Sequence, residues 1–251
     1  MLTQPLLDKL GQLRLPAFRS ALEDQMQSPH YTELSFEERL GLLVDIETTH
    51  RTQNRLKRRL KAARFPLQAT MEDLDLSARR GLKRAQVLEL AQGGWIANHL
   101  NCLVLGPTGA GKTFLATALG RSACQAEFTV RYHRTSRLLQ QLELAQADGS
   151  YPKLLRSLAR TQLLILDDWL RDPLTRNQAR DLLEILDDRY GRTATLVATQ
   201  VPLTDWHLRI PDPTLSDSVH DRLIHNAYRI VFDILRTSIY SSSTEVSWGK
   251  I

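Results

Sequence analysis

The chain has 251 residues, of which 42% are hydrophobic, so it can form one large domain or a core domain with a smaller attachment. Its 33 Lys and Arg against 28 Asp and Glu give a net charge of +5, which is compatible with nucleic-acid binding without establishing it. Its two cysteines, Cys102 and Cys124, exclude a disulfide framework or a zinc site. Neither a signal peptide nor a transmembrane stretch is seen, so we expect a soluble cytoplasmic protein with no membrane partner.

The first 64 residues predict helices. Pro16 and Pro29 interrupt the helical pattern, so we expect several short helices rather than one. Ser35 and Glu38 have the spacing of a capping box, which begins a longer helix. We predict that residues 1–70 form a helical N-terminal domain for DNA binding or oligomerisation and that residues 71–251 form a separate ATPase domain.

A basic segment follows within this N-terminal region. Residues 48–71 contain no acidic residue, and Leu56 and Leu60 hold an apolar stripe between the charges. The pattern indicates an amphipathic helix whose exposed face can neutralise DNA phosphates. A solvated face paired with acidic groups from elsewhere in the fold is the alternative. The basic residues are Arg51, Arg55, Lys57, Arg58, Arg59, Lys61 and Arg64.

A phosphate-binding motif lies near the middle of the chain. The apolar run 102–105 is typical of a buried parallel strand, and residues 114–119 begin a helix. Between them stands the pattern G-x-x-x-x-G-K-T of a P-loop, whose glycines turn backbone N–H groups toward phosphate oxygens. We predict that Lys112 reaches the β- and γ-phosphates of ATP and that Thr113 ligates Mg²⁺, against the alternative of a glycine-rich turn that only caps a helix. The loop residues are Gly106, Pro107, Thr108, Gly109, Ala110, Gly111, Lys112 and Thr113.

A second cluster of cations follows the motif. We predict a strand at residues 128–132 and a helix from residue 136 to 147. His133, Arg134 and Arg137 come at the end of that strand and enter the helix. They are our second candidates for DNA contacts.

Two carboxylates end the next apolar run. Residues 163–166 are four aliphatic residues followed by Asp167 and Asp168. A buried strand would place Asp167 at its tip beside the phosphates, where it helps to hold Mg²⁺, and Asp168 would polarise the attacking water. A plain strand end with two acids is the alternative.

The remaining pattern completes an α/β fold. We predict a helix at residues 174–190, whose acidic residues form a solvated face, then a strand at 193–198 and a helix at 216–226. Either Thr199 or Gln200, at the tip of the strand, would sense the γ-phosphate or orient the water. Strands alternating with helices predict a P-loop NTPase fold, a parallel sheet flanked by helices.

Several blocks together resemble a known family. They are residues 34–40, 106–113, 132–134, 163–169, 205–207 and 221–226, and the resemblance extends from about residue 5 to 230. On these blocks the chain resembles the IstB-like ATP-binding proteins, the helper ATPases of bacterial insertion sequences, which are related to DnaC-type helicase loaders within the AAA+ superfamily. Leu170 departs from the expected glycine, Ala198 and Thr199 depart from the usual Thr-Ser, and the segment after Val231 is unlike the family's polar ending.

The resemblance implies an ATPase that forms a homo-oligomeric ring or spiral on double-stranded DNA and recruits a cognate transposase. A DnaC-like loader of a replicative helicase is the alternative it implies. The ATP site would lie between subunits, and Arg222 matches the arginine that a neighbour supplies to it. An ion pair with Asp221 or another surface carboxylate is the other interpretation of Arg222.

Overall fold

The computed structural model describes residues 3–75 and 82–232. The chain divides into two compact units, Met1–Lys61 and Ala62–Ile251, and each is described by itself. The sequence analysis placed this division after residue 70. Among the described residues, no helix combines the length and apolar character needed to cross a membrane.

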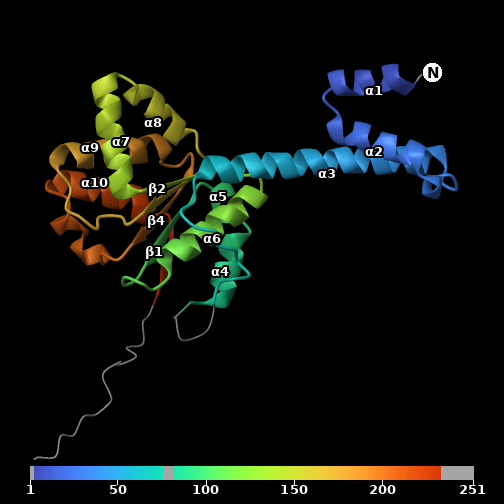
Figure 1. The fold of residues 1–251 in the computed structure, drawn as a ribbon. Coiled ribbons are helices and arrows are strands. Elements are labelled where there is room, and N and C mark those ends of the chain that lie inside the picture. Colours follow the sequence, from blue (N-terminus) through green and yellow to red (C-terminus); the bar gives the residue numbers. More distant parts are fainter. Residues whose placement is uncertain (1–2, 76–81, 233–251) are drawn as a thin grey trace, which may run out of the picture. The chain divides into compact units, whose positions relative to one another are not determined.

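The N-terminal unit is helical, as its sequence predicts. Pro16 stands at the first position of α2, where its missing N–H leaves no helical bond unmade. The Ser35 amide donates to the Glu38 carboxylate at 2.8 Å, and the Glu38 amide donates to the Ser35 hydroxyl at 3.3 Å, which confirms the capping box. The helices are α1 (Thr3–Gln12), α2 (Pro16–Gln27), the 3₁₀ helix η1 (Pro29–Tyr31) and α3 (Phe36–Ala63) (Figure 1).

The basic segment is the second half of α3. This helix runs for 28 residues without interruption, so the acidic first turn and the basic segment belong to one rod. Arg64 then adopts a φ of 57°, which ends the helix just before Phe65 and Pro66.

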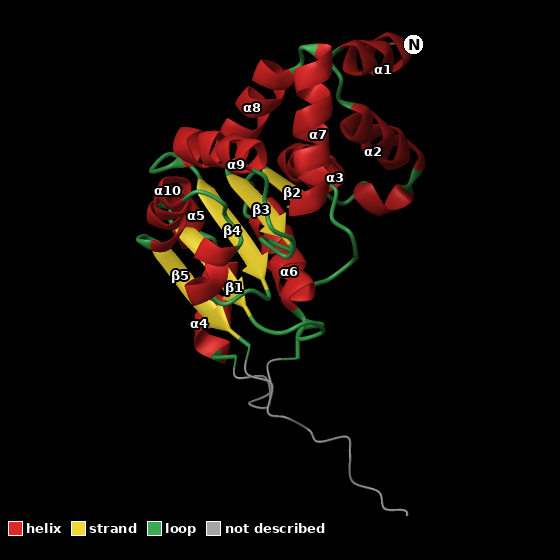
Figure 2. Ribbon diagram, turned by 90° about the vertical axis from the view of Figure 1, so that its left-hand side faces the viewer, coloured by secondary structure: helices red, strands yellow, loops and turns green. Residues whose placement is uncertain are grey.

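The second unit is the predicted parallel α/β sheet. All four strand pairings are parallel, in the order β2-β3-β4-β1-β5, and helices cover both faces (Figure 2). Its strands are β1 (Asn101–Leu105), β2 (Val130–Arg134), β3 (Leu163–Asp167), β4 (Ala194–Thr199) and β5 (Ala227–Val231). Its helices are α4 (Arg84–Ala91), α5 (Gly94–Ala97), α6 (Lys112–Gln125), α7 (Thr135–Asp148), α8 (Tyr151–Ala159), α9 (Arg176–Arg189), η3 (Leu203–Leu208) and α10 (Pro213–Ile224).

Side chains alternate between two layers of this unit. Leu164 and Leu166 of β3 enter a core formed with α7, α8, α9 and α10, while α6 lies on the opposite face (Figure 1). Both faces of the sheet are shielded from solvent at β3 and β4, since every residue of these two strands is buried. This explains why these strands are continuous apolar runs. Both cysteines are buried and free.

Two boundaries differ from the prediction. β2 begins at Val130, opposite Leu163 of β3, so His133 and Arg134 lie within the strand instead of after it. The last helix begins at Pro213 because the Asp212 carboxylate caps it by accepting from the Thr214 amide at 3.0 Å.

The fifth strand escaped prediction. Residues 227–231 pair in parallel with β1, whereas the sequence analysis ended at a helix reaching residue 226. The chain leaves α10 and enters β5 after only two residues, with no Gly or Pro to mark the change. Most of the segment after Val231, which departs from the ending expected of the family, lies outside the described residues.

The acidic side of α9 is only partly solvated, contrary to the prediction. The Tyr151 hydroxyl lies 2.8 Å from the carboxylates of both Asp181 and Glu184. Asp187 accepts from Arg222 at 2.7 Å. These carboxylates therefore tie α9 to α8 and α10.

Candidate functional site

The P-loop connects the central strand β1 to α6 with the geometry that its glycines allow. Gly106, Gly109 and Gly111 have φ values of 155°, 80° and 101°, which other residues rarely adopt. A Cβ atom on Gly106 would lie 2.7 Å from the Cβ of Phe232, so the close approach of the chain beyond β5 also requires glycine there. The loop thus opens at the carboxyl edge of the sheet, where ligands of this fold class bind.

A pocket of about 450 Å³ lies over the loop. The Lys112 amine donates to the Pro107 carbonyl at 2.8 Å, so the side chain folds back over the loop. Burial lowers the pKa of Lys112, and the nearby carboxylates of Asp167 and Asp168 oppose that shift. The lining residues are Leu67, Thr108, Gly109, Gly111, Lys112, Thr113, Phe114, Asp168, Arg171 and Gln200.

Asp167 is almost completely enclosed. It stands at the tip of β3 with 1% of its surface exposed. One carboxylate oxygen accepts from the Thr113 hydroxyl at 2.7 Å and from the Tyr132 hydroxyl at 2.6 Å, and the other accepts from the Asp168 amide at 2.9 Å. Sequence reasoning brought Thr113 and Asp167 to one site but missed Tyr132.

This oxygen set fits Mg²⁺. The ion prefers hard oxygen ligands and usually takes one or two protein groups together with phosphate oxygens and water. The Thr113 hydroxyl and the Asp167 carboxylate, already in contact, would hold it. The bound ion would neutralise charge on the β- and γ-phosphates.

Tyr132 belongs to the site through the neighbouring strand. Its side chain is buried, and burial, followed by the hydrogen bond to Asp167, raises its pKa far above the ordinary value. The phenol therefore remains a donor and fixes one orientation of the carboxylate. The only feature of the sequence that could have identified this contact is that Tyr132 lies in the strand preceding the one that ends in Asp167.

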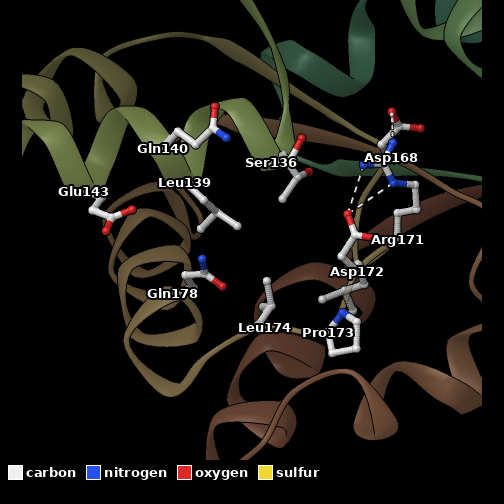
Figure 3. A pocket seen from close by; sticks show the side chains of 12 residues that line it. Ser136, Leu139, Gln140, Glu143, Asp168, Arg171, Asp172, Pro173, Leu174 and Gln178 are labelled. Atoms are coloured by element: carbon white, nitrogen blue, oxygen red, sulfur yellow. Dashed lines mark hydrogen bonds and ion pairs between the residues drawn. The ribbon is translucent and has the colours of Figure 1, made fainter.

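Asp168 lies at the border of two pockets. It adopts a φ of 54°, and 35% of its side chain is exposed. Its carboxylate lies 3.6 Å from Arg171 and 3.9 Å from Arg134. Figure 3 shows Arg171 reaching both Asp168 and Asp172 at the edge of a second pocket of about 210 Å³. The predicted water-polarising group is therefore present in the nucleotide pocket and is engaged by two arginines.

The two sensor candidates have different surroundings. The Thr199 hydroxyl is buried, donates to the Trp169 carbonyl at 2.6 Å and accepts from the Val201 amide at 3.0 Å, so it is used in holding the chain. The Gln200 amide oxygen accepts from the hydroxyl of Thr108 in the P-loop. Of the two, only Gln200 lines the nucleotide pocket.

Arg222 does not line the pocket of its own chain. Its guanidinium bonds Asp187 at 2.7 Å, pairs with Asp221 and lies 4.8 Å from the centre of the Tyr190 ring. The hydrogen bond that Arg222 donates to Asp187 is the main cause that raises the pKa of Arg222. The ion pairs expected from the alternative interpretation thus exist in the single chain.

The basic half of α3 is mostly unpaired with acids. Arg51 bonds Glu47 at 2.8 Å. No acidic partner among the described residues is found for Arg55, Lys57, Arg58 or Lys61. Neutralisation by acids from elsewhere in the fold therefore does not account for these four charges.

The second set of DNA candidates does not share one environment. Burial lowers the pKa of His133 to about 4, with repulsion from Arg131 and Arg64 acting in the same direction. His133 therefore carries no charge at neutral pH. Arg134 faces Asp168, and Arg137 donates to Gln140 at 3.2 Å.

Comparisons with known proteins agree with this geometry. A family model described as IstB-like ATP binding protein matches residues 8–238. The insertion sequence ATP-binding protein y4pL of Sinorhizobium fredii is 44% identical over 230 residues, which cover 92% of this chain and 94% of the relative. The ATP-binding protein of insertion sequence IS1162 of Pseudomonas fluorescens is 45% identical over 203 residues, or 80% of this chain and 88% of the relative.

Solved structures share the fold of the second unit. The AMPPCP-bound DnaA of Aquifex aeolicus has a TM-score of 0.57 at 17% identity and covers 68% of this chain and 51% of its own. The DnaC helicase loader has a TM-score of 0.53 at 18% identity and covers 70% of this chain and 99% of its own. Identities this low show a shared fold and no more.

Proposed function

Because the chain belongs to the IstB-like ATP-binding protein family, we propose that it is a DNA-dependent ATPase of an insertion sequence, which assembles on double-stranded DNA with ATP and recruits a transposase. The observation that carries the hydrolytic part is Asp167, held between Thr113 and Tyr132 beside Lys112. The names of the relatives support the link to transposition.

The pocket residues divide the work of phosphate transfer. The P-loop amides and Lys112 hold the β- and γ-phosphates, and Thr113 and Asp167 hold Mg²⁺. Asp168 orients the attacking water, for which its contacts with Arg134 and Arg171 must loosen. Gln200 contacts the γ-phosphate from the end of β4. ADP and phosphate are the products.

Arg222 completes the site of a neighbouring subunit. Its absence from its own pocket and its partial exposure, 32% of the side chain, support a role in trans. Asp187 and Tyr190 hold the guanidinium in one orientation, so little freedom is lost when it meets a phosphate. An arginine supplied in trans couples assembly to hydrolysis.

A complementation experiment tests hydrolysis and assembly together. Phosphate release by the full chain is measured with and without duplex DNA, and DNA is expected to increase it. Arg222→Ala should lose hydrolysis by at least tenfold and keep its affinity for ATP. Mixing it with Lys112→Ala should restore activity, because one chain supplies the arginine and the other an intact P-loop. A mixture no more active than its components would refute the role in trans.

The partner is tested by direct binding. The cognate transposase should bind the ATP- and DNA-loaded protein, and Lys112→Ala should not support that complex. The DnaC-like alternative predicts a purified replicative helicase as the partner instead. Binding of the helicase and not of the transposase would replace the proposal by that alternative.

A further inference from the structure

A pocket in the N-terminal unit is separate from the nucleotide site. It lies where the turn between α1 and α2 meets the middle of α3, and its volume is about 450 Å³. Arg14 comes from the turn, and His50, Arg51, Arg55 and Arg58 come from α3. Four arginines thus border one hollow.

The acidic residue of this pocket is already engaged. Glu47, 6% exposed, accepts from the amides of Ala17 and Phe18 at 3.1 Å and 3.0 Å, and from Arg51 at 2.8 Å. Its carboxylate fastens the start of α2 to α3 and balances the charge of Arg51. For the Arg14, Arg55 and Arg58 side chains, the part of the chain that the structure describes provides no acidic partner. The pocket is therefore strongly positive.

His50 adds a hydrogen-bond donor. Its Nε2 lies 3.0 Å from the Asn54 side-chain nitrogen, and its Nδ1 is buried with no hydrogen-bond partner among the described residues. With Asn54 donating to Nε2, the proton of the neutral ring is on Nδ1. A buried N–H without an acceptor is unfavourable, and a small shift of the ring that opens Nδ1 to the pocket would let an anionic oxygen satisfy it.

We propose that this pocket binds one backbone phosphate of DNA, held by Arg14, Arg55 and Arg58 and by the His50 Nδ1–H. Guanidinium groups form paired hydrogen bonds to phosphate oxygens and suit this ligand better than ammonium groups do. Lys57 and Lys61 are exposed on the same helix, so the pocket phosphate would be one of several contacted along a strand. The inference rests on the proposed DNA binding and gives it a specific contact.

The test compares a pocket charge with its neighbour. Binding of the full chain to a labelled duplex is measured by fluorescence anisotropy over a series of salt concentrations, with ATP constant. Arg58→Gln and the control Lys57→Gln remove the same charge one residue apart, so each should reduce the salt slope by about one. At any one salt concentration, Arg58→Gln should weaken binding at least about fivefold more than the control, because it also loses directed hydrogen bonds.

His50→Ala distinguishes a pocket that binds a phosphate through hydrogen bonds from a surface that binds DNA through charge alone. The side chain is neutral in the proposed state, so its loss should leave the salt slope unchanged and weaken binding several-fold. Circular dichroism and thermal melting check that the helices persist. If they do not, Arg55→Gln replaces this variant and, like Arg58→Gln, is judged by its loss of affinity beyond that of Lys57→Gln. Inorganic phosphate at matched ionic strength should compete with DNA for the wild type more than for Arg58→Gln.

The outcomes distinguish this inference from the proposed function. Equal losses for Arg58→Gln and Lys57→Gln, with wild-type binding by His50→Ala, would leave DNA binding intact and refute the pocket. Phosphate competition without any difference in DNA affinity among the variants would identify a free anion as the ligand and also refute it. A wild-type chain that fails to bind duplex DNA would refute the DNA part of the proposed function itself.

Discussion

In the nucleotide pocket the polar side chains hold one another, whereas on the basic half of α3 four cations lack any acidic partner among the described residues. Asp167 accepts three hydrogen bonds and is nearly inaccessible to solvent. Lys57, by contrast, is exposed and has no partner in the described part of the chain.

This difference fits the ligand that we propose for each surface. Phosphoryl transfer depends on placing charges to within fractions of an ångström, so its groups are positioned before the ligand arrives. Binding to a DNA backbone depends on the number of charges near the phosphates and tolerates mobile side chains. Changes in the nucleotide pocket should therefore be severe and insensitive to salt, and changes on α3 should be graded and salt-dependent.

Lys112→Ala should produce the largest effect. The amine closes over the P-loop, and its removal takes away the positive charge that reaches the β- and γ-phosphates. ATP affinity, measured with a fluorescent analogue, should fall by at least about a hundredfold, or roughly 2.7 kcal/mol. Lys153→Ala, on the exposed surface of α8, is the matched control and should bind normally. Unchanged affinity in Lys112→Ala would remove the nucleotide site from this loop.

His133 should respond to pH as a half-buried, neutral ring instead of a DNA contact. Its pKa falls from 6.5 to about 4 in the folded state, so the unfolded chain binds its proton first as the pH drops. Stability should therefore be complete above pH 6.5 and decrease between pH 6.5 and 4, by an amount on the order of 3 kcal/mol.

Urea unfolding at several pH values measures this loss. His133→Gln should flatten the decline in that window relative to the wild type, while His207→Gln, on an exposed histidine, should not. Equal slopes for the wild type and His133→Gln would contradict the burial of a neutral ring.

Tyr132→Phe should affect Mg²⁺ more than ATP. The hydroxyl orients the Asp167 carboxylate, and losing such a second-layer contact usually weakens metal binding ten- to a hundredfold. The Mg²⁺ concentration needed for half-maximal hydrolysis should rise accordingly, and the Mg²⁺-dependent part of nucleotide affinity should shrink. Nucleotide binding without Mg²⁺ should be unchanged.

Tyr151→Phe is the control for this change. Its hydroxyl also bonds two carboxylates, those of Asp181 and Glu184, but Tyr151 does not line the pocket. A lower melting temperature for Tyr132→Phe with normal Mg²⁺ dependence would mean that the tyrosine only stabilises the sheet.

The sequence was most informative where chemistry restricts the backbone. The G-x-x-x-x-G-K-T pattern predicts the backbone geometry of the P-loop. Few other loops place three glycines with positive φ values next to a Lys-Thr pair. The apolar run that ends in Asp167 and Asp168 was equally easy to interpret, because ligands bind at the carboxyl ends of the strands of a parallel sheet.

Contacts between distant segments were beyond its reach. The bond from Tyr132 to Asp167 depends on the register of two strands, and that register is invisible in either strand alone. The choice between Thr199 and Gln200 depended on which side chain the end of β4 turns toward the P-loop. The pocket around His50 forms only when the turn carrying Arg14 folds back on α3.

The smallest effects should come from exposed lysines of α3. Lys57→Gln and Lys61→Gln each remove one charge that has no acidic partner among the described residues, so each should lower duplex affinity only about two- to fivefold at moderate salt. Because neither lysine is fixed by a neighbour, the double variant should show the sum of the two free-energy losses and a salt slope reduced by about two. ATP hydrolysis without DNA should match the wild type. If the free-energy losses of the two single variants do not add up in the double variant, these lysines share one ordered phosphate. The basic face would then be as prearranged as the nucleotide pocket, and the contrast between the two surfaces would not hold.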